Sequence, residues 1–202
     1  MLKAEEMMAL FNLSIEDYHV KDDVDSPEVN PFPIGSMQEL LYTKNWIDTV
    51  QWHLEDIIRD PNIQPEKALE IKRRIDASNQ KRTDLVEQID DAMLSLFEGV
   101  KLQSYARLNT ESPAWAIDRL SILALKLFHM HIEASRENSS PELQAKNQLK
   151  LAVLKEQEQD LTTAIDHLLE DLAMGRRISK VYRQMKMYND PELNPVLYKS
   201  EE

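Results

Sequence analysis

Glycine is scarce in this chain, with only three among 202 residues, and this scarcity restricts the fold more than any other feature. β-Hairpins and tight sheet turns use glycine for positive φ angles, so a sheet protein of this length would carry many more. Nine prolines separate long charged runs whose apolar residues recur at helical spacing. We therefore expect an all-α fold, an antiparallel bundle of four main helices with an extra N-terminal helix and an irregular C-terminal tail.

Local signals predict where these helices begin and end. Ser36 and Glu39 form a capping box, and the segment 21–35, with three prolines, predicts the loop before it. Proline at the first helical position marks three further starts, at Pro65, Ser112-Pro113 and Ser140-Pro141. Gly99 predicts a C-terminal cap. The expected helices cover residues 2–19, 36–60, 65–98, 113–134 and 141–187, the last running through Gly175.

The chain is predicted to form a single helical domain over residues 1–202. Residues 1–35 would supply the N-terminal helix and loop, residues 36–187 the bundle, and residues 188–202 the tail. The tail contains Tyr188, Leu193, Val196, Leu197 and Tyr198. Because so apolar a segment is not typical of a disordered chain, we expect it to be ordered against the bundle.

Charge and composition exclude several classes of function. The formal net charge of -12 argues against nucleic acid and anionic membranes as partners, since both are bound through clustered Lys and Arg. Without cysteine there is no disulfide, thiolate nucleophile or cysteine metal site. No signal peptide is evident, and no apolar run reaches the roughly 18 to 20 residues of a membrane span. A cytoplasmic location is the expectation.

The helix predicted from residue 36 has three strips at about 100° per residue. Its apolar centre contains Trp46, Ile47, Val50, Leu54 and Ile57. The opposite strip contains Lys44, Asp48, Gln51 and Glu55, which we expect to be solvated. The strip between them mixes aromatic and hydrogen-bonding groups, as a ligand-facing surface would: Tyr42, Asn45, Thr49, Trp52, His53 and Asp56. In the alternative interpretation, His53 is an ordinary boundary histidine and Asp56 a surface charge.

Arg82 falls at the centre of the apolar stripe of the following helix. Arginine cannot lose its charge, so it needs a carboxylate or an anionic ligand there. We expect Asp118 as its first partner and Asp56 as its second, beside a cavity next to Trp52 and His53. Two structural alternatives remain open: an ion pair that only fixes the register of the bundle, or a stem along the core with its head in water.

No catalytic motif of high specificity occurs, and no cofactor is indicated. Glu87 and Asp90 have a spacing that could chelate Mg²⁺, but acidic helices often contain it by chance. We therefore predict no metal site beyond this weak pair. Glu111, just before a helix, could turn toward the end of the bundle or interact only with the helix dipole.

Several separated motifs resemble one known family. They are Asn45-Trp46, Trp52-His53-Leu54-Glu55-Asp56, Ile75-Asp76 with Asn79, Arg82, Asp84, Glu87, Ile89 and Asp90, Thr110-Glu111-Ser112-Pro113, Ile117-Asp118-Arg119-Leu120-Ser121, and Lys186-Met187-Tyr188-Asn189-Asp190-Pro191. Over about residues 5–197 the chain resembles the domain of unknown function 4254, common in Bacteroidetes. The resemblance implies a bacterial cytoplasmic protein, sometimes encoded near glycosyltransferases of surface-polysaccharide or lipopolysaccharide synthesis. It implies no activity, cofactor or catalytic residue.

Three functional hypotheses follow. The first is a helical accessory protein that docks on a glycosyltransferase or self-associates, with its polar network serving only the fold. The second is an enzyme or binding protein for a phosphorylated sugar or nucleotide, in which Arg82 binds the phosphate, Trp52 stacks on a sugar or base, and His53 with Asp56 transfers protons. Its pocket would contain Asn45, Trp52, His53, Asp56, Asn79, Arg82, Glu111 and Asp118. The third is a Mg²⁺-dependent nucleotide pyrophosphohydrolase using Glu87, Asp90 and Asp56.

Overall fold

The protein is mostly helical in the computed structural model, which describes residues 1–199. This confirms the all-α prediction. The elements are α1 (Ala4–His19), α2 (Met37–Ile57), α3 (Pro65–Ser95), β1 (Arg107–Leu108), α4 (Pro113–Ser135), α5 (Pro141–Ala173), β2 (Arg177–Ile178), the 3₁₀ turn η1 (Met187–Asn189) and α6 (Pro195–Tyr198). In the described part of the chain, no helix is long and apolar enough to cross a membrane.

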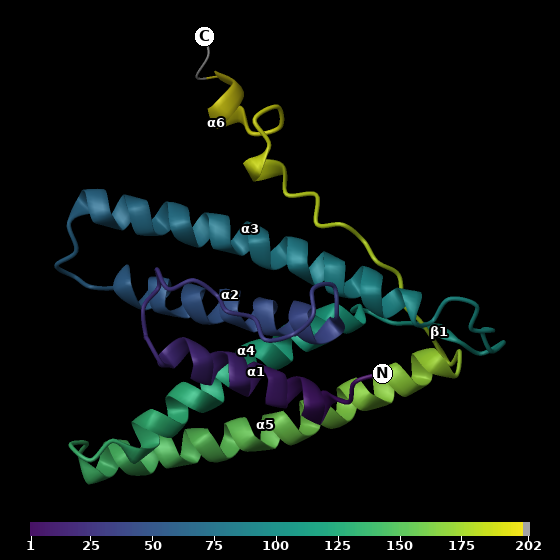
Figure 1. The fold of residues 1–202 in the computed structure, drawn as a ribbon, viewed down its shortest axis with the longest axis horizontal. Coiled ribbons are helices and arrows are strands. Elements are labelled where there is room, and N and C mark those ends of the chain that lie inside the picture. The colour runs from purple at the N-terminus through teal and green to yellow at the C-terminus, as the bar shows by residue number, and fades with distance from the viewer. Residues whose placement is uncertain (200–202) are drawn as a thin grey trace.

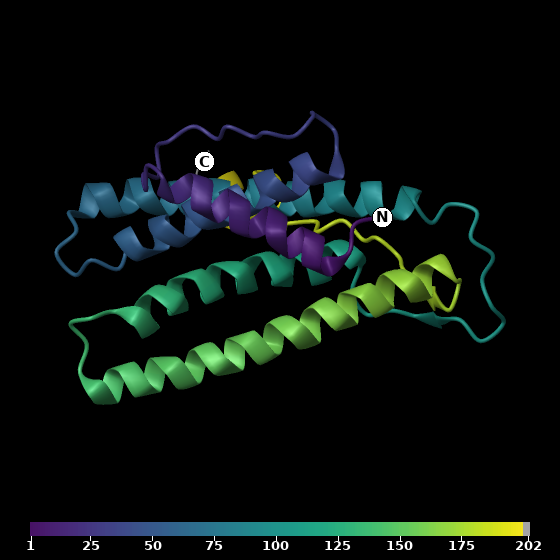
Figure 2. The same cartoon turned by 60° about the horizontal axis from the view of Figure 1, so that its bottom comes forward.

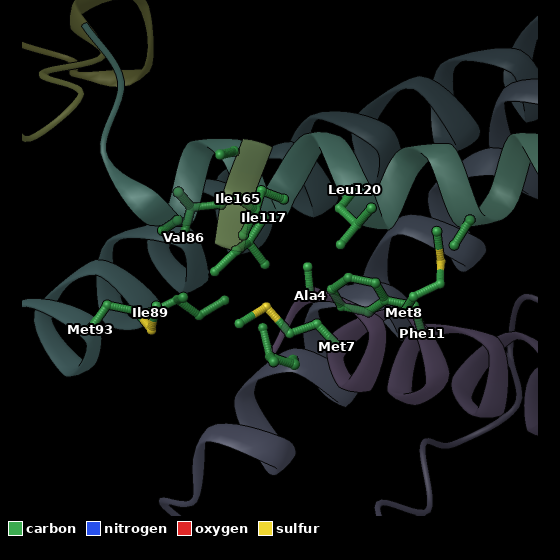
Figure 3. Packing of buried hydrophobic residues seen from close by; sticks show 14 of the residues in the cluster. Ala4, Met7, Met8, Phe11, Val86, Ile89, Met93, Ile117, Leu120 and Ile165 are labelled. Atoms are coloured by element: carbon green, nitrogen blue, oxygen red, sulfur yellow. The ribbon is translucent and has the colours of Figure 1, made fainter. Parts of the chain in front are cut away.

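The long helices form two antiparallel hairpins that pack on each other. In Figures 1 and 2, α2 and α3 make one layer and α4 and α5 the other, while α1 lies across them. Helix α1 contacts α2, α4 and α5, and α2 also packs against α3 and α4. Figure 3 shows where α1, α3, α4 and α5 meet, with Met7, Phe11, Ile89, Ile117 and Ile165 among the buried side chains.

The predicted helix starts are confirmed. The Ser36 hydroxyl accepts a hydrogen bond from the Glu39 amide at 3.1 Å, and the Ser140 hydroxyl accepts one from the Leu143 amide at 3.2 Å. Proline occupies the first turn of α3, α4 and α5. These residues satisfy or remove amide groups that lack a partner at a helix N-terminus, so each helix begins where its sequence dictates.

The prediction that the last long helix continues through Gly175 is wrong. Helix α5 ends at Ala173, and Gly175 has a φ of +66°. A Cβ atom at this glycine would lie 2.3 Å from the Lys101 carbonyl oxygen, so the two backbones approach too closely for any side chain. The chain then turns into β2, which pairs in parallel with β1. The glycine therefore ends the helix and allows the two-stranded pairing of β1 with β2, called the β1–β2 clasp below, to form.

The tail also differs from expectation. Arg183 pairs with Glu87 and Asp91, and the Lys186 ammonium group donates to the Thr83 hydroxyl at 2.6 Å, so residues up to Lys186 lie along α3. Beyond that point the described chain leaves the bundle (Figure 1), so this segment does not lie against the bundle as predicted. The tail side chains that were expected to pack are exposed: Tyr188, Leu193, Val196, Leu197 and Tyr198. Its helical turns are too short to present an apolar stripe.

Candidate functional site

A network of two cations and two carboxylates lies inside the bundle. Arg82 of α3 binds Asp118 of α4 through two hydrogen bonds, with Nε 3.1 Å from Oδ1 and Nη2 2.6 Å from Oδ2. The predicted pairing of these residues is confirmed. Lys44 of α2 contacts Asp48 one turn later and lies 2.7 Å from Asp118 Oδ1. Each charge thus has an opposite charge beside it, which is what a buried ion requires.

Lys44 and Asp48 were expected to be solvated, and that prediction is wrong. Their exposed fractions are 1% and 3%. The reason is that α2 packs against α1, α3 and α4, so its central turns have no face left for water. The helical phase derived from the apolar residues was sound for Trp46 and Leu54, but it assumed a single buried face.

Neutral polar groups complete the network. The Ser121 hydroxyl donates to Asp48 Oδ2 at 2.6 Å, and Asn45 Nδ2 donates to the Ser121 hydroxyl at 3.0 Å. Asn45 is fully buried, so the structure places this predicted pocket residue in the core. Burial raises the pKa of the Asp48 carboxyl, while Lys44 and Arg82 act in the opposite direction. Its ionised form therefore depends on both cations.

Arg82 also borders two cavities. The first has a volume of about 310 Å³ and is lined by Asp48, Gln51, Trp52, Glu55, Asp56, Arg59, Arg82 and Ile122. The second, of about 740 Å³, shares Arg82 and Ile122 and adds Asp118, Arg119 and Lys126 among its lining residues. A cavity beside Arg82 and Trp52 was predicted. Asp56 lines it, but no ion pair joins Asp56 to Arg82 among the described residues, and Asp118 and Asp48 take that role instead.

Two residues that line the first cavity, Asp48 and Gln51, carry buried side-chain oxygens without hydrogen-bond partners. Arg82 Nε lies 3.1 Å from Asp48 Oδ1, but its one hydrogen is donated to Asp118, so Asp48 Oδ1 is buried without a hydrogen bond. Gln51 donates to Asn79 at 2.9 Å, and its own Oε1 is likewise unpaired. Arg82 Nη1 makes no hydrogen bond to the described residues. Such groups are unfavourable unless a bound molecule or water satisfies them.

The other predicted site residues are not all brought to this cavity. Asn79 reaches its edge by accepting from Gln51, whereas His53 lies away from the cavity lining. Glu111 is exposed and pairs with Arg119 at 3.1 Å, near the start of α4. Glu111 lines neither cavity at Arg82 but a third one with Asp90 and Arg119, so the eight predicted pocket residues do not share one cavity.

Glu87 and Asp90, the weak Mg²⁺ pair, make separate contacts. Glu87 pairs with Arg183 in the tail. Asp90 is buried and accepts from the Ser112 hydroxyl at 2.5 Å and from the Ala114 amide at 3.0 Å. Burial raises the pKa of the Asp90 carboxyl, and these hydrogen bonds lower it. Asp90 therefore caps α4, a role that sequence reasoning gave to Ser112.

Sequence reasoning missed a cluster of three histidines. His19 of α1, His53 of α2 and His129 of α4 each place one ring nitrogen within 4.8 Å of the others. Burial, with the neighbouring His53 and His19, lowers the pKa of His129 to about 4, and burial with His19 also lowers the pKa of His53. His53 and His129 are thus favoured as neutral rings. The only signal in the sequence was that His53 and His129 fall off the solvated strips of their helices.

A comparison with models of protein families matched this chain. The model of a family described as "Protein of unknown function (DUF4254)" matches residues 38–181. This range contains the whole Arg82 network and two of the three clustered histidines, and it excludes α1. No curated protein and no solved structure matched the chain.

Proposed function

The chain belongs to the DUF4254 family of proteins of unknown function, and from this premise we propose that its cavity at Arg82 binds a phosphorylated sugar or a sugar nucleotide. The observation that carries the proposal is the set of unpaired polar atoms at the cavity. Two of these atoms, Asp48 Oδ1 and Gln51 Oε1, are acceptors, and one, Arg82 Nη1, is a donor with positive charge. A ligand that satisfies all three has hydroxyl groups and an anionic group.

The acceptors favour a polyhydroxylated ligand. A hydroxyl can donate to Asp48 Oδ1 or Gln51 Oε1, and a sugar ring offers several hydroxyls at once. Trp52 lines the same cavity, and an indole ring provides an apolar surface against which the C–H face of a sugar can pack. A volume of about 310 Å³ lies at the lower end of small-molecule sites, which suits a monosaccharide unit.

The cations favour an anionic group on that ligand. Arg82 is 26% exposed, so its Nη1 edge can meet a phosphate while Nε and Nη2 remain bound to Asp118. A guanidinium held in this way loses little freedom when it binds an anion. The second cavity continues from Arg82 past Arg119, Lys126 and Asp160, which gives space and two further cations for the rest of a larger ligand such as a nucleotide.

Calorimetry can test this proposal with four probes: free hexose, hexose phosphate, a nucleoside diphosphate sugar and inorganic phosphate. We expect hexose phosphate or the sugar nucleotide to bind more tightly than hexose or phosphate alone, because only these probes satisfy both the acceptors and Arg82. Gln51→Leu removes one acceptor and should weaken binding about tenfold, the effect of about one hydrogen bond. Heats at the level of buffer for all four probes would contradict the proposal.

A matched control separates the cavity from general charge effects. Arg136 is an exposed arginine paired with Glu133 at the end of α4, outside both cavities. Arg136→Ala should leave affinity within twofold of the unmodified protein. Arg59 lines the cavity and is exposed, so Arg59→Ala should weaken phosphate-bearing probes and leave free hexose unchanged. An equal effect of both substitutions would show that only net charge matters.

A second candidate function, docking of a protein partner, is favoured by one apolar groove. A cavity of about 680 Å³ between α4 and α5 has five apolar side chains in its lining, and two of them, Leu149 and Val153, are 71% and 52% exposed. Lys126, Lys146 and Lys150 flank it. An amphipathic helix with acidic residues beside its apolar face fits this combination of shape and charge. The glycosyltransferases implied by the family resemblance are the partners to test first.

The groove is tested by placing a charge in it. Leu149→Asp should abolish binding of such a partner in a calorimetric titration, while Leu69→Asp, which changes another exposed leucine, on α3, should not. Analytical ultracentrifugation of the protein alone distinguishes a second copy from a different partner. Dimerisation that is lost in Leu149→Asp would assign the groove to self-association and would overturn the partner assignment.

A further inference from the structure

Three of the five histidines in the chain converge at one point, and they come from three different helices. His19 is the last residue of α1, His53 lies near the end of α2, and His129 lies in the second half of α4. The remaining two, His131 and His167, are exposed and lie outside the cluster. We propose that the converging histidines bind a divalent transition-metal ion of the zinc type.

The distance between the first two rings fits a shared metal ion. Nε2 of His19 and Nε2 of His53 are 3.2 Å apart. Two nitrogens on a tetrahedral zinc ion, each at about 2.0 to 2.1 Å, are separated by about 3.3 Å. One ring nitrogen of His129 lies within 4.8 Å of both, so a modest shift of this side chain completes a three-nitrogen site.

The surroundings orient the rings as metal ligands require. Nδ1 of His19 lies 2.7 Å from the Ile15 carbonyl oxygen, and a carbonyl can only accept, so Nδ1 carries the proton and Nε2 keeps its lone pair. A hydrogen bond from the second ring nitrogen to a backbone carbonyl is the usual support of a metal-bound histidine. Tyr18 stacks on His53 and Trp52 stacks on His129, with centroids 5.0 Å and 4.7 Å apart, which restricts both rings.

Packing alone does not explain the cluster. A hydrogen bond between His19 and His53 would satisfy those two rings, but Nε2 of His129 is buried and has no hydrogen-bond partner among the described residues. An unpaired buried nitrogen is unfavourable, and a metal ion that accepts its lone pair removes the penalty. The ion therefore accounts for all three rings, whereas the hydrogen bond accounts for two.

Asp22 offers a fourth ligand. Its Oδ1 lies 3.9 Å from Nε2 of both His19 and His53, and the residue has a φ of +53°, the one positive φ among the described non-glycine residues. The Asp22 side chain is 61% exposed, so it can move toward the ion or give way to water. Three imidazoles and a carboxylate suit zinc, cobalt or nickel, whereas Mg²⁺ and Ca²⁺ prefer oxygen ligands.

Metal binding can be measured on the intact protein after treatment with a chelator and dialysis. We expect calorimetry to give one Zn²⁺ per chain, Co²⁺ to produce the visible absorption of a tetrahedral site, and Mg²⁺ to give neither signal. Zinc should also raise the unfolding temperature, because the ion joins α1, α2 and α4 in the folded state only. Failure to bind Zn²⁺ or Co²⁺ at one equivalent would overturn the proposal.

Substitutions identify the ligands. His53→Gln and His129→Gln should each weaken Zn²⁺ binding by more than about 100-fold, the upper end of the effect of losing an outer-shell partner. The matched controls His131→Gln and His167→Gln should bind as the unmodified protein does. Equal loss in all four variants would place the ion elsewhere and overturn the assignment. None of the three histidines lines the Arg82 cavity, so hexose phosphate binding should persist in the metal-free protein.

A further variant covers the case in which a histidine substitution prevents folding. Asp22→Asn preserves a residue type that tolerates positive φ, and its side chain is exposed, so the protein should fold normally. We expect this variant to keep one Co²⁺ per chain but to shift the visible spectrum, because one ligand oxygen changes. An unchanged spectrum would remove Asp22 from the site, and loss of all absorption in the folded variant would contradict a three-histidine core.

Discussion

Two Lys–Asp pairs with the same four-residue spacing show how context sets the role of a residue. Lys72 and Asp76 lie on the surface of α3, with exposed fractions of 56% and 57%, whereas Lys44 and Asp48 of α2 are buried. The surface pair is screened by water and contributes little to the free energy of unfolding. The buried pair is balanced by Arg82 and Asp118. Removal of any one of these four charges leaves an unbalanced charge inside the bundle.

Lys44→Met should therefore destabilise the protein strongly. The substitution leaves Asp48 and Asp118 facing Arg82 alone, and loss of one partner from a buried ion pair costs about 3 to 5 kcal/mol. Adding Asp48→Leu restores a one-to-one balance and should recover much of this loss. Urea unfolding measures both changes.

Lys72→Met is the control for that experiment, because it removes a lysine from a pair of identical spacing. It should cost less than about 1 kcal/mol. Similar losses in Lys44→Met and Lys72→Met would mean that the buried network is not what stabilises this part of the bundle.

The sequence located part of the network but not all of it. Arg82 interrupts an apolar stripe, so its need for a carboxylate could be deduced, and Asp118 was available on the most apolar helix. Lys44 and Asp48 could not be found in this way, because charged residues opposite an apolar stripe are normally solvated. The histidine cluster was equally hidden, since its members are spread over three helices and have no diagnostic spacing.

At the scale of elements, the start of α4 has an unexpected cap. The Ser112 side chain does not cap the helix, and Asp90 of α3 instead accepts from both Ser112 and the Ala114 amide. This contact fixes the end of α3 to the beginning of α4. It supplies a tertiary link at the position where sequence rules see only a local motif.

Asp90→Ala should thus destabilise the protein more than Ser112→Ala. Loss of the Asp90 carboxylate leaves the Ala114 amide and the Ser112 hydroxyl buried without an acceptor, which should cost about 2 kcal/mol or more. Loss of the serine removes one hydrogen bond, which should cost about 1 kcal/mol. Chemical denaturation of the two variants gives the order. The reverse order would restore Ser112 as the functional cap.

The turn after α5 depends on Gly175. Gly175 and Gly99 both have positive φ, but a Cβ atom at Gly99 meets open space, while one at Gly175 would overlap the Lys101 carbonyl. Gly99→Ala should cost about 1 to 2 kcal/mol from backbone strain alone. Gly175→Ala should cost about 1 to 3 kcal/mol more because the two segments must separate.

Hydrogen exchange can locate the effect of Gly175→Ala. The Asn109 amide donates to the Ile178 carbonyl at 2.8 Å, so it reports on the pairing of β1 and β2. Its exchange should accelerate in Gly175→Ala and remain unchanged in Gly99→Ala. Unchanged exchange in both variants would mean that the pairing does not need the close approach at Gly175.

For the whole molecule, the helical class and the starts of the long helices followed from the sequence, because proline, capping serines and apolar periodicity act locally. The predicted cap at Gly99 was wrong, since α3 already ends at Ser95. The path of the chain after Gly175 could not be predicted from the sequence. The periodicity of α5 continues into the next segment, whereas the positive φ of Gly175 and its close approach to Lys101 accompany the end of the helix. The tail was mispredicted for a related reason, since an apolar composition does not say whether a complementary surface exists.

Truncation after Lys186 tests the role of that tail. The removed segment includes Tyr188, Val196 and Tyr198, which are exposed, so the free energy of unfolding should change by less than about 0.5 kcal/mol. Truncation after Lys180 also removes the contacts of Arg183 and Lys186 with α3 and should cost more. A large loss from the shorter deletion would show that the tail packs on the bundle in solution.

The pairing of β1 with β2 has a consequence for the order of folding. A short turn joins α4 to α5 at one end of their hairpin, and the two strands join the flanking segments at the other end, so residues 107–178 form a closed ring (Figure 2). Only two residues pair on each side, too few to form before the helices bring them together. The β1–β2 clasp must therefore form after the α4–α5 hairpin. It should also be the first part of this ring to open when the protein unfolds.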